Sequence, residues 1–193
     1  MIKICTDSCV DINKDQIEDN NISVLPLSII LGDKEYLDGV DITPKEIFAY
    51  VEKTGQLPKT AARSIEDFRN FFENLLKDGS EVIYMGISSK LSSAFNYACQ
   101  AKEELQNDRL HIVDSKSLST GIGLLVLYAC NLIKQGLSCE EICRKLEKQT
   151  DLNQASFVVD KLDYLYKGGR CSAMARFGAN LLKIKPRLEL VDG

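Results

Sequence analysis

The sequence predicts an α/β protein, with a parallel-sheet, Rossmann-like domain at residues 1–150 and an incomplete second α/β domain at residues 151–193. Two observations carry this prediction. Segments of strand length alternate with segments that have helix start and stop signals, which is typical of parallel sheets with right-handed crossovers. Residues 82–85, VIYM, are apolar without alternation, as in a central parallel strand that is covered on both faces.

Short apolar runs bounded by turn residues predict the strands. Pro26 interrupts the second run, which predicts an edge strand or a strand that begins after the proline. Turn signals at Gly32-Asp33 and Asp38-Gly39 bound the third run. The predicted strands are residues 2–5, 24–31, 35–37, 82–85, 110–113, 155–159 and 187–191.

Capping residues mark the predicted helices. The segment TPKE at residues 43–46 combines an N-cap threonine, a proline at the first helical position and a capping-box glutamate. Gly55 ends this helix, and Phe48 and Val51 are expected on its inner face. The other predicted helices cover residues 14–20, 64–79, 92–105, 121–135, 138–149, 162–166 and 173–182.

A loop at residues 59–63 is expected to hold Thr60 between two of these helices. The helix that follows carries Phe68, Phe71 and Phe72. Rings at this spacing are typical of a helix face in a hydrophobic core, rather than of a cofactor site.

The turn after the strand at residues 82–85 is rich in hydroxyl groups. Ser88, Ser89, Ser92 and Ser93 follow Gly86, and Ser92 or Ser93 can cap the next helix. A helix that starts there points N–H groups and a partial positive charge toward the carboxyl end of the sheet. This pattern indicates a neutral site for a carboxylate or a phosphate, although serine clusters before helices are often only caps and solvated loop residues.

Nucleophilic serine chemistry is not indicated. The turn lacks the G-x-S-x-G pattern, and the only histidine, His111, lies in a predicted strand. At the end of the first strand, Asp7 would repel an anion, so we expect it to accept hydrogen bonds from neighbouring turn amides. No catalytic residue is therefore predicted.

Composition excludes several other classes of function. Of the 193 residues, 45% are hydrophobic and 27% are charged, as in globular proteins with a core, and the net charge of −4 without a basic run argues against a nucleic-acid partner. The most apolar segment, residues 122–133, is too short to span a bilayer, and no signal peptide is recognised. We expect a cytoplasmic protein.

The seven cysteines are odd in number and form no C-x-x-C pair. We therefore expect core thiols in a reducing compartment and no metal site. At the other end, Asp192-Gly193 follows a strand as a hairpin turn would, with no returning strand. The second domain is accordingly expected to be truncated.

Several separated blocks of the sequence occur in the order that is typical of one known family. These blocks are TDS at residues 6–8, VLPL at 24–27, YLDG at 36–39, residues 87–98, VDS at 113–115, VDKL at 159–162 with YL at 164–165, KGGR at 167–170 and IKP at 184–186. Together they resemble the DegV family of fatty-acid-binding subunits of bacterial fatty acid kinase, and the match extends over essentially the whole chain.

The resemblance implies that one long-chain fatty acid, such as palmitate, is held between two α/β domains, with no cofactor and no metal. Hydroxyl groups of a threonine and a serine would bind the carboxylate, and these fall on Thr60 and Ser92, with Ser93 adjacent. The family's T-S-Q-P-S and S-G-T-Y motifs read TAARS and SSAF here.

The resemblance also implies that the chain is not itself an enzyme, because an ATP-binding kinase subunit phosphorylates the lipid. Arg170 matches a family arginine that faces the kinase or the phosphoryl chemistry; pairing with a surface carboxylate is its alternative role. A family histidine near the head group comes from beyond the matched segment, and His111 does not correspond to it.

Two other classes of function remain open. One is an enzyme that acts on a small phosphorylated or carboxylated metabolite, with Asp7, Asp114 or a serine as its catalyst. The other is a degenerate interaction domain that has lost its pocket. The incomplete second domain would expose a strand edge, which makes self-association a further hypothesis.

Overall fold

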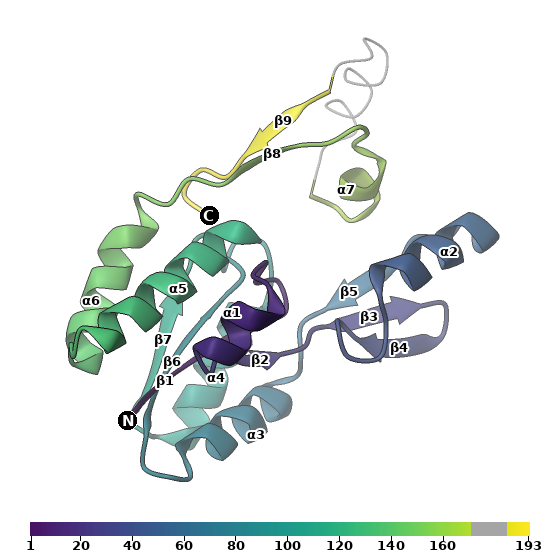
Figure 1. Ribbon diagram of the computed structural model, residues 1–193. Helices are drawn as coiled ribbons and strands as arrows, with labels where there is room; N and C mark the ends of the chain where they lie inside the picture. The colour runs from purple at the N-terminus through teal and green to yellow at the C-terminus, as the bar shows by residue number, and fades with distance from the viewer. Residues whose placement is uncertain (171–184) are drawn as a thin grey trace. The chain divides into compact units, whose positions relative to one another are not determined.

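The computed structural model describes residues 1–170 and 185–193 (Figure 1). Contacts divide the chain into two compact units, each built from separate segments. The first contains residues 1–27, 62–154 and 192–193, and the second contains residues 28–61 and 155–191. The domain boundary expected at residue 150 stays a prediction. Within the described ranges, no helix is both long and apolar enough to cross a membrane.

The first unit is built on a parallel sheet of four strands, in the order β2-β1-β6-β7. This sheet confirms the predicted α/β class, and β6 lies inside it, as its apolar sequence indicates. Cys5 is opposite Tyr84, and Gly86 is opposite Asp114. The strands are β1 (Ile2–Asp7), β2 (Ser23–Leu25), β6 (Glu81–Gly86) and β7 (Leu110–Asp114).

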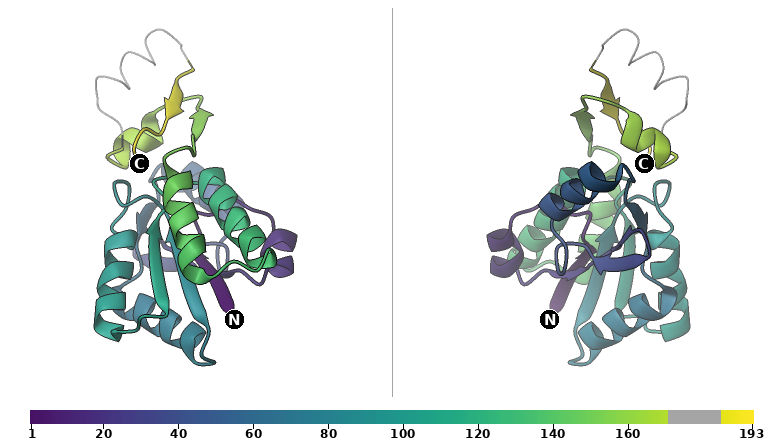
Figure 2. Two further views of the ribbon diagram at one scale, coloured as in Figure 1. Left: turned by 90° about the vertical axis from the view of Figure 1, so that its left-hand side faces the viewer. Right: turned by 90° about the vertical axis from the view of Figure 1, so that its right-hand side faces the viewer.

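Helices cover both faces of this sheet (Figures 1 and 2). Side chains of α1, α5 and α6 join one core cluster, and side chains of α3 and α4 join the other. The helices are α1 (Lys14–Asp19), α3 (Ile65–Leu76), α4 (Ala94–Leu105), α5 (Thr120–Lys134) and α6 (Cys139–Thr150).

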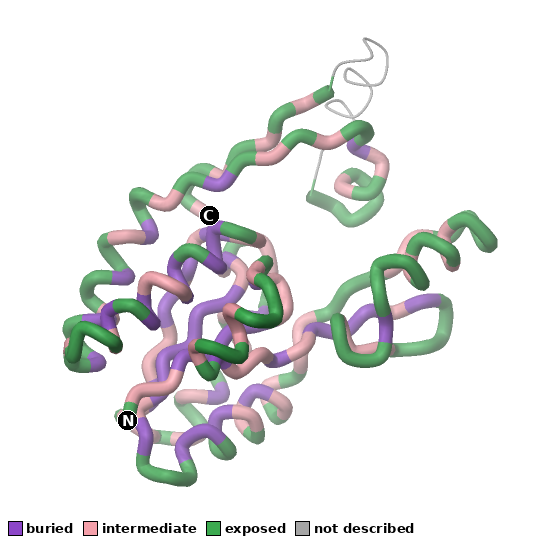
Figure 3. The backbone as a smooth tube through the Cα atoms, viewed as in Figure 1, coloured by how far each residue is buried: buried purple, intermediate pink, exposed green. Residues whose placement is uncertain are grey.

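Side chains of β6 point alternately to the two faces of the sheet, and both faces are covered, so the central positions of this strand have to be apolar. Ile83 and Met85 enter the cluster with α5 and α6, whereas Val82 and Tyr84 enter the cluster with α3 and α4. The Tyr84 ring meets the rings of Phe68 and Phe72 edge to face, with centroid distances of 5.6 Å to each. The predicted core role of these two phenylalanines is therefore confirmed, and buried residues follow the strands in Figure 3.

The second unit contains a small antiparallel sheet in the order β4-β3-β5. Ile29, Leu31 and Ile42 form its core, and the partly buried side chains of Ile47 and Tyr50 pack against it. Its elements are β3 (Ser28–Leu31), β4 (Lys34–Leu37), α2 (Pro44–Thr54) and β5 (Lys59–Ala61), followed late in the chain by β8 (Ser156–Val158), α7 (Asp163–Lys167) and β9 (Arg187–Glu189).

The predicted caps of α2 are confirmed. The side chain of Thr43 accepts a hydrogen bond from the N–H of Glu46 in a full capping box, and Gly55 ends α2 in the left-handed conformation. Ser64 and Ser138 begin α3 and α6 in the same way. The helix expected at residues 173–182 lies outside the described residues.

Three predictions about position are wrong. Thr60 does not lie in a loop, because residues 59–61 pair with β3 as an edge strand, and this pairing is not visible in the local sequence. Phe48 is 59% exposed, since the inner face of α2 follows Ile47 and Tyr50 instead. The first strand extends through Asp7 rather than ending at Cys5.

Pro26 separates two strands of different sheets instead of interrupting one strand. β2 ends at Leu25 as an edge of the parallel sheet, and β3 begins at Ser28 in the antiparallel sheet. A proline is well tolerated between the two strands, because it has no N–H to donate and would leave a gap in the hydrogen bonds of a continuous strand.

Candidate functional site

The carboxyl ends of β1 and β6 are joined by a buried carboxylate. Asp7 is fully buried, and its Oδ1 accepts a hydrogen bond from the N–H of Cys9 at 3.0 Å. Its Oδ2 accepts from the N–H of Ile87 at 2.9 Å and from the hydroxyl of Tyr84 at 3.1 Å. The expectation that Asp7 binds turn amides is confirmed.

Burial raises the pKa of the Asp7 carboxyl, and the hydrogen bonds from Ile87, Cys9 and Tyr84 oppose that shift. All of these donors are neutral, and their bonds hold the carboxylate against the backbone. Asp7 is therefore a structural group at the point where β6 turns into the serine-rich segment.

Gly86 leaves room for this arrangement. A Cβ atom at this position would overlap both the Tyr84 hydroxyl and the Asp7 carboxylate. Both of those groups are fully buried and bonded to each other, so neither can move aside at low cost. Packing thus requires glycine at the last position of β6.

Two buried serines tie the β6–α4 turn to the loop after β7. The Ser115 hydroxyl donates to the carbonyl oxygen of Gly86 at 2.5 Å, and the N–H of Ser88 donates to the carbonyl oxygen of Ser117 at 2.9 Å. The Ser88 hydroxyl donates to the carbonyl oxygen of Gly193 at 3.0 Å. These bonds fix the shape of the turn before it reaches α4.

Asp114 supports the same turn from the end of β7. Its Oδ1 accepts hydrogen bonds from the N–H groups of Ser89 at 3.2 Å and Lys116 at 3.0 Å. Asp114 and Asp7 were the candidate acids of the enzyme hypothesis, and both carboxylates are bound to backbone amides. Neither forms a paired acid and base.

Ser92 and Ser93 lie where this hydrogen-bonded turn leads into α4. The Ser92 oxygen accepts a hydrogen bond from the N–H of Ala94 at 3.2 Å. A hydroxyl that accepts one bond still has its O–H to donate, so half-buried Ser92 can present that proton to an anion. Ser93 is the N-cap residue, is exposed, and makes no side-chain capping bond.

The amino end of α4 differs from those of α2, α3 and α6. Those three helices have capping boxes closed by Glu46, Asp67 and Glu141, whereas α4 has no acidic residue in its first turn. An anion at the start of α4 would therefore meet the favourable end of the helix dipole without a carboxylate of the first turn in competition.

The other two predicted site residues belong to the second unit. Thr60 lies on the edge strand β5 opposite Ile29, and it is exposed. Arg170 follows α7; its guanidinium donates to the carbonyl oxygen of Gly168, and its backbone N–H donates to that of Leu165. Their roles toward a ligand or a partner stay predictions.

A groove of about 960 Å³ occurs elsewhere in the first unit. It is lined by the amino-terminal ends of β1 and β2 and by parts of α1 and α5, including Ile2, Ile22 and Ile133. This is the opposite edge of the parallel sheet from the serine-rich turn. The groove is therefore not part of the candidate anion site.

One side-chain cluster was not predicted from the sequence. His111 on β7 and Cys139 and Cys143 on α6 bring their ligand atoms within 4.8 Å of one another. The C-x-x-x-C spacing on a helix could have signalled two thiols on one face, but the histidine joins them only through the tertiary fold. The expectation that the chain has no metal site stays a prediction.

The fold and the turn define a class: an α/β protein with a parallel sheet between helices and a hydroxyl-rich helix start at the carboxyl edge, where such folds bind anionic ligands. The model of a family described as "Uncharacterised protein, DegV family" matches residues 1–193. The chain belongs to the DegV family.

Relatives and solved structures agree with this assignment. A DegV domain-containing protein of Staphylococcus aureus is 40% identical over 190 residues, which are 98% of this chain and 67% of the relative. A DegV family protein from Thermus thermophilus, whose structure is described as one of fatty acid binding, superposes with a TM-score of 0.89 at 33% identity, over 99% of this chain and 68% of that one. A stearic-acid-binding protein from Eubacterium ventriosum superposes with a TM-score of 0.90 at 31% identity, over 100% and 68% of the two chains.

Proposed function

We propose that this chain binds a long-chain fatty acid and holds the carboxylate at the amino end of α4. Ser92 donates to the carboxylate, Thr60 is a second donor, and Ser93, the next residue after Ser92, also belongs to the proposed site. The observation that carries the proposal is the likeness to the fatty-acid-binding proteins from Thermus thermophilus and Eubacterium ventriosum, which extends over nearly the whole chain. The O–H that Ser92 retains supports the choice of donor.

The acyl chain supplies most of the affinity in this proposal. Burying a methylene group contributes roughly 0.8 kcal/mol, so about fourteen of them contribute on the order of 10 kcal/mol before ordering costs. A neutral hydrogen bond to the head group contributes only about 1 kcal/mol net. The hydroxyl groups therefore mainly determine which end of the lipid is held at α4.

In the same proposal the chain is a binding subunit of a bacterial cytoplasmic system, and a separate ATP-binding kinase phosphorylates the lipid. Arg170, which is exposed at the end of α7, is the residue we assign to the kinase-facing surface. No cofactor takes part in binding. Self-association remains a hypothesis, and light scattering over a range of concentrations tests it.

Ser92→Ala is expected to weaken fatty-acid binding by about 5- to 150-fold. The change removes a half-buried O–H donor, which is worth about 1–3 kcal/mol when its acceptor is left unpaired. Calorimetric titration of the delipidated protein with palmitate measures the effect.

Ser138→Ala is the matched control, because it removes a serine hydroxyl from the start of α6, where the side chain closes a capping box. It should lower stability by about 1 kcal/mol and leave the palmitate affinity unchanged. An unchanged affinity for Ser92→Ala would show that Ser92 is only a structural residue of the turn.

Thr60→Val is expected to weaken palmitate binding by about 5- to 10-fold, since valine keeps the shape of the side chain and removes the donor. Thr54→Val, in α2 of the same unit, removes a hydroxyl that bonds to the carbonyl oxygen of Tyr50 and should not change the affinity. The same titration compares the two variants. Equal affinities would remove Thr60 from the proposed site.

A further inference from the structure

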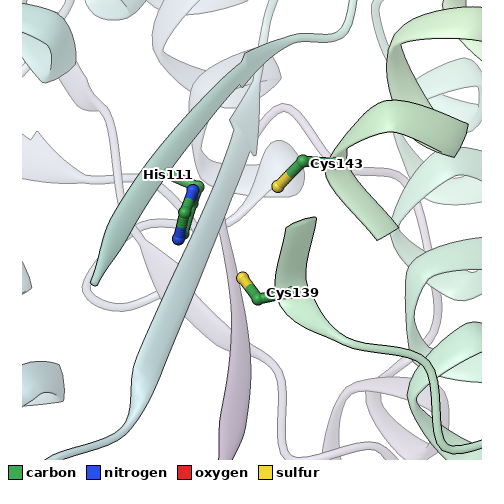
Figure 4. A group of neighbouring side chains, drawn as sticks. All are labelled: His111, Cys139 and Cys143. Carbon is green, nitrogen blue, oxygen red and sulfur yellow. The ribbon is translucent and has the colours of Figure 1, made fainter. Parts of the chain in front are cut away.

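The side chains of His111, Cys139 and Cys143 converge on one point between β7 and α6 (Figure 4). The two cysteines are one helical turn apart, which places their thiols on the same face of α6. His111 extends from β7 toward that face, and the three ligand atoms lie within 4.8 Å of one another. All three residues belong to the first unit.

The imidazole of His111 has an unusual environment for a buried polar group. Its Nε2 atom is shielded from solvent and has no hydrogen-bond partner among the described residues. The nearest carboxylate oxygen is Glu81 Oε1 at 3.9 Å, which is beyond hydrogen-bond range. More than nine in ten buried polar groups have a partner, so this nitrogen indicates an interaction that the protein side chains alone do not supply.

Glu81 adds a fourth possible ligand on the same side. It lies at the start of β6, two residues before Ile83, which is opposite His111 in the sheet, and its carboxylate also interacts with the side chain of Cys139. Lys102 and Glu147 are the other charged groups near Cys143. The cluster thus combines two thiols, one imidazole and one carboxylate.

We propose that His111, Cys139 and Cys143 bind a zinc ion, with the carboxylate of Glu81 as the fourth ligand. Zinc accepts sulfur, nitrogen and oxygen ligands in a tetrahedral arrangement, and mixed thiolate and imidazole sets favour it over magnesium or calcium. Zn–S bonds of about 2.3 Å and Zn–N bonds of about 2.0 Å place the ligand atoms about 3.5–3.8 Å apart. The side chains therefore close by about 1 Å around the ion.

Four protein ligands would make this a structural site without an open position for catalysis. The ion would connect α6 to β6 and β7, on the face of the sheet opposite α3 and α4. Binding releases protons from the thiols and stabilises the folded chain, because the unfolded chain does not hold the ligands together. The site is independent of the proposed lipid ligand.

Titration of the metal-free full chain with Co²⁺ tests the ligand set, since tetrahedral cobalt thiolates absorb strongly in the visible and the near ultraviolet. We expect one Co²⁺ per chain, with thiolate charge-transfer absorption that one equivalent of Zn²⁺ abolishes. In Cys143→Ser the intensity of this charge-transfer absorption should fall to half of the wild-type value or less. Cys99→Ser, a half-buried helix cysteine outside the cluster, should retain it.

Two further measurements do not depend on a variant that folds. X-ray absorption of the zinc-loaded protein should show about two sulfur ligands per ion, and saturation with Zn²⁺ at about 100 times its Kd should raise the melting temperature by roughly 5–10 °C. Coordination by nitrogen and oxygen alone would overturn the proposal. Absorption of equal strength in Cys143→Ser, or a folded wild-type chain that binds no Co²⁺, would overturn it as well.

Discussion

Asp7→Ala is expected to lower the free energy of unfolding by about 3–5 kcal/mol, the largest effect of any single change proposed for this chain. The variant removes the acceptor of three hydrogen bonds, one from the fully buried Tyr84 hydroxyl and two from the part-buried N–H groups of Ile87 and Cys9. Each unsatisfied group costs about 1–3 kcal/mol, and some relief comes from rearrangement of the turn. Urea unfolding monitored by circular dichroism measures the loss.

Asp19→Ala is the control for this experiment, because Asp19 is an exposed carboxylate in the last turn of α1. Its removal should change the stability by less than about 0.5 kcal/mol. A loss below about 1 kcal/mol for Asp7→Ala would mean that water or the turn itself replaces the carboxylate. In that case Asp7 would not fix the position of the serine-rich turn.

Gly86→Ala is expected to lower the free energy of unfolding by about 3 kcal/mol. The new methyl group would overlap the Tyr84 hydroxyl and the Asp7 carboxylate, which hold each other in place in the core. Either the strand end or the Tyr84 ring must shift, and that ring packs edge to face on Phe68 and Phe72.

A double-mutant cycle with Tyr84→Phe tests the cause of this effect. Removing the hydroxyl relieves part of the overlap, so Gly86→Ala should cost less in the Tyr84→Phe background than in the wild type. Equal costs in the two backgrounds would show that the Tyr84 hydroxyl is not what makes glycine necessary at this position.

The elements that were correctly predicted from the sequence depend on local physics. The helix starts at Thr43, Ser64 and Ser138 depend on residues three positions apart, and each of these helices begins in the structure as expected. The central position of β6 follows from the need to cover both of its faces, which demands a continuous apolar run.

The errors have non-local causes. Thr60 is in a strand because β3 offers an unpaired edge, and β3 is distant from it in sequence. Phe48 is exposed although it is apolar, since the position of the helix face is determined by the contacts of Ile47 and Tyr50. Neither fact can be derived from a local pattern.

The candidate site was likewise predictable from the sequence only in part. The hydroxyl-rich turn and the helix start were visible in the sequence as a serine cluster after an apolar run. The bonds that shape it were not, because Ser115 and Asp114 reach the turn from the next strand of the sheet. The zinc ligands are likewise assembled by the pairing of β6 with β7 and by the packing of α6.

We propose above all that this chain binds a long-chain fatty acid through hydroxyl groups at the start of α4. Native mass spectrometry of the delipidated chain, incubated with one equivalent of palmitate, tests it most directly. We expect a one-to-one complex for the wild type and for Ser138→Ala, and a much smaller bound fraction for Ser92→Ala. A wild-type chain that stays free of lipid even in excess palmitate would contradict the proposal that the chain binds fatty acids.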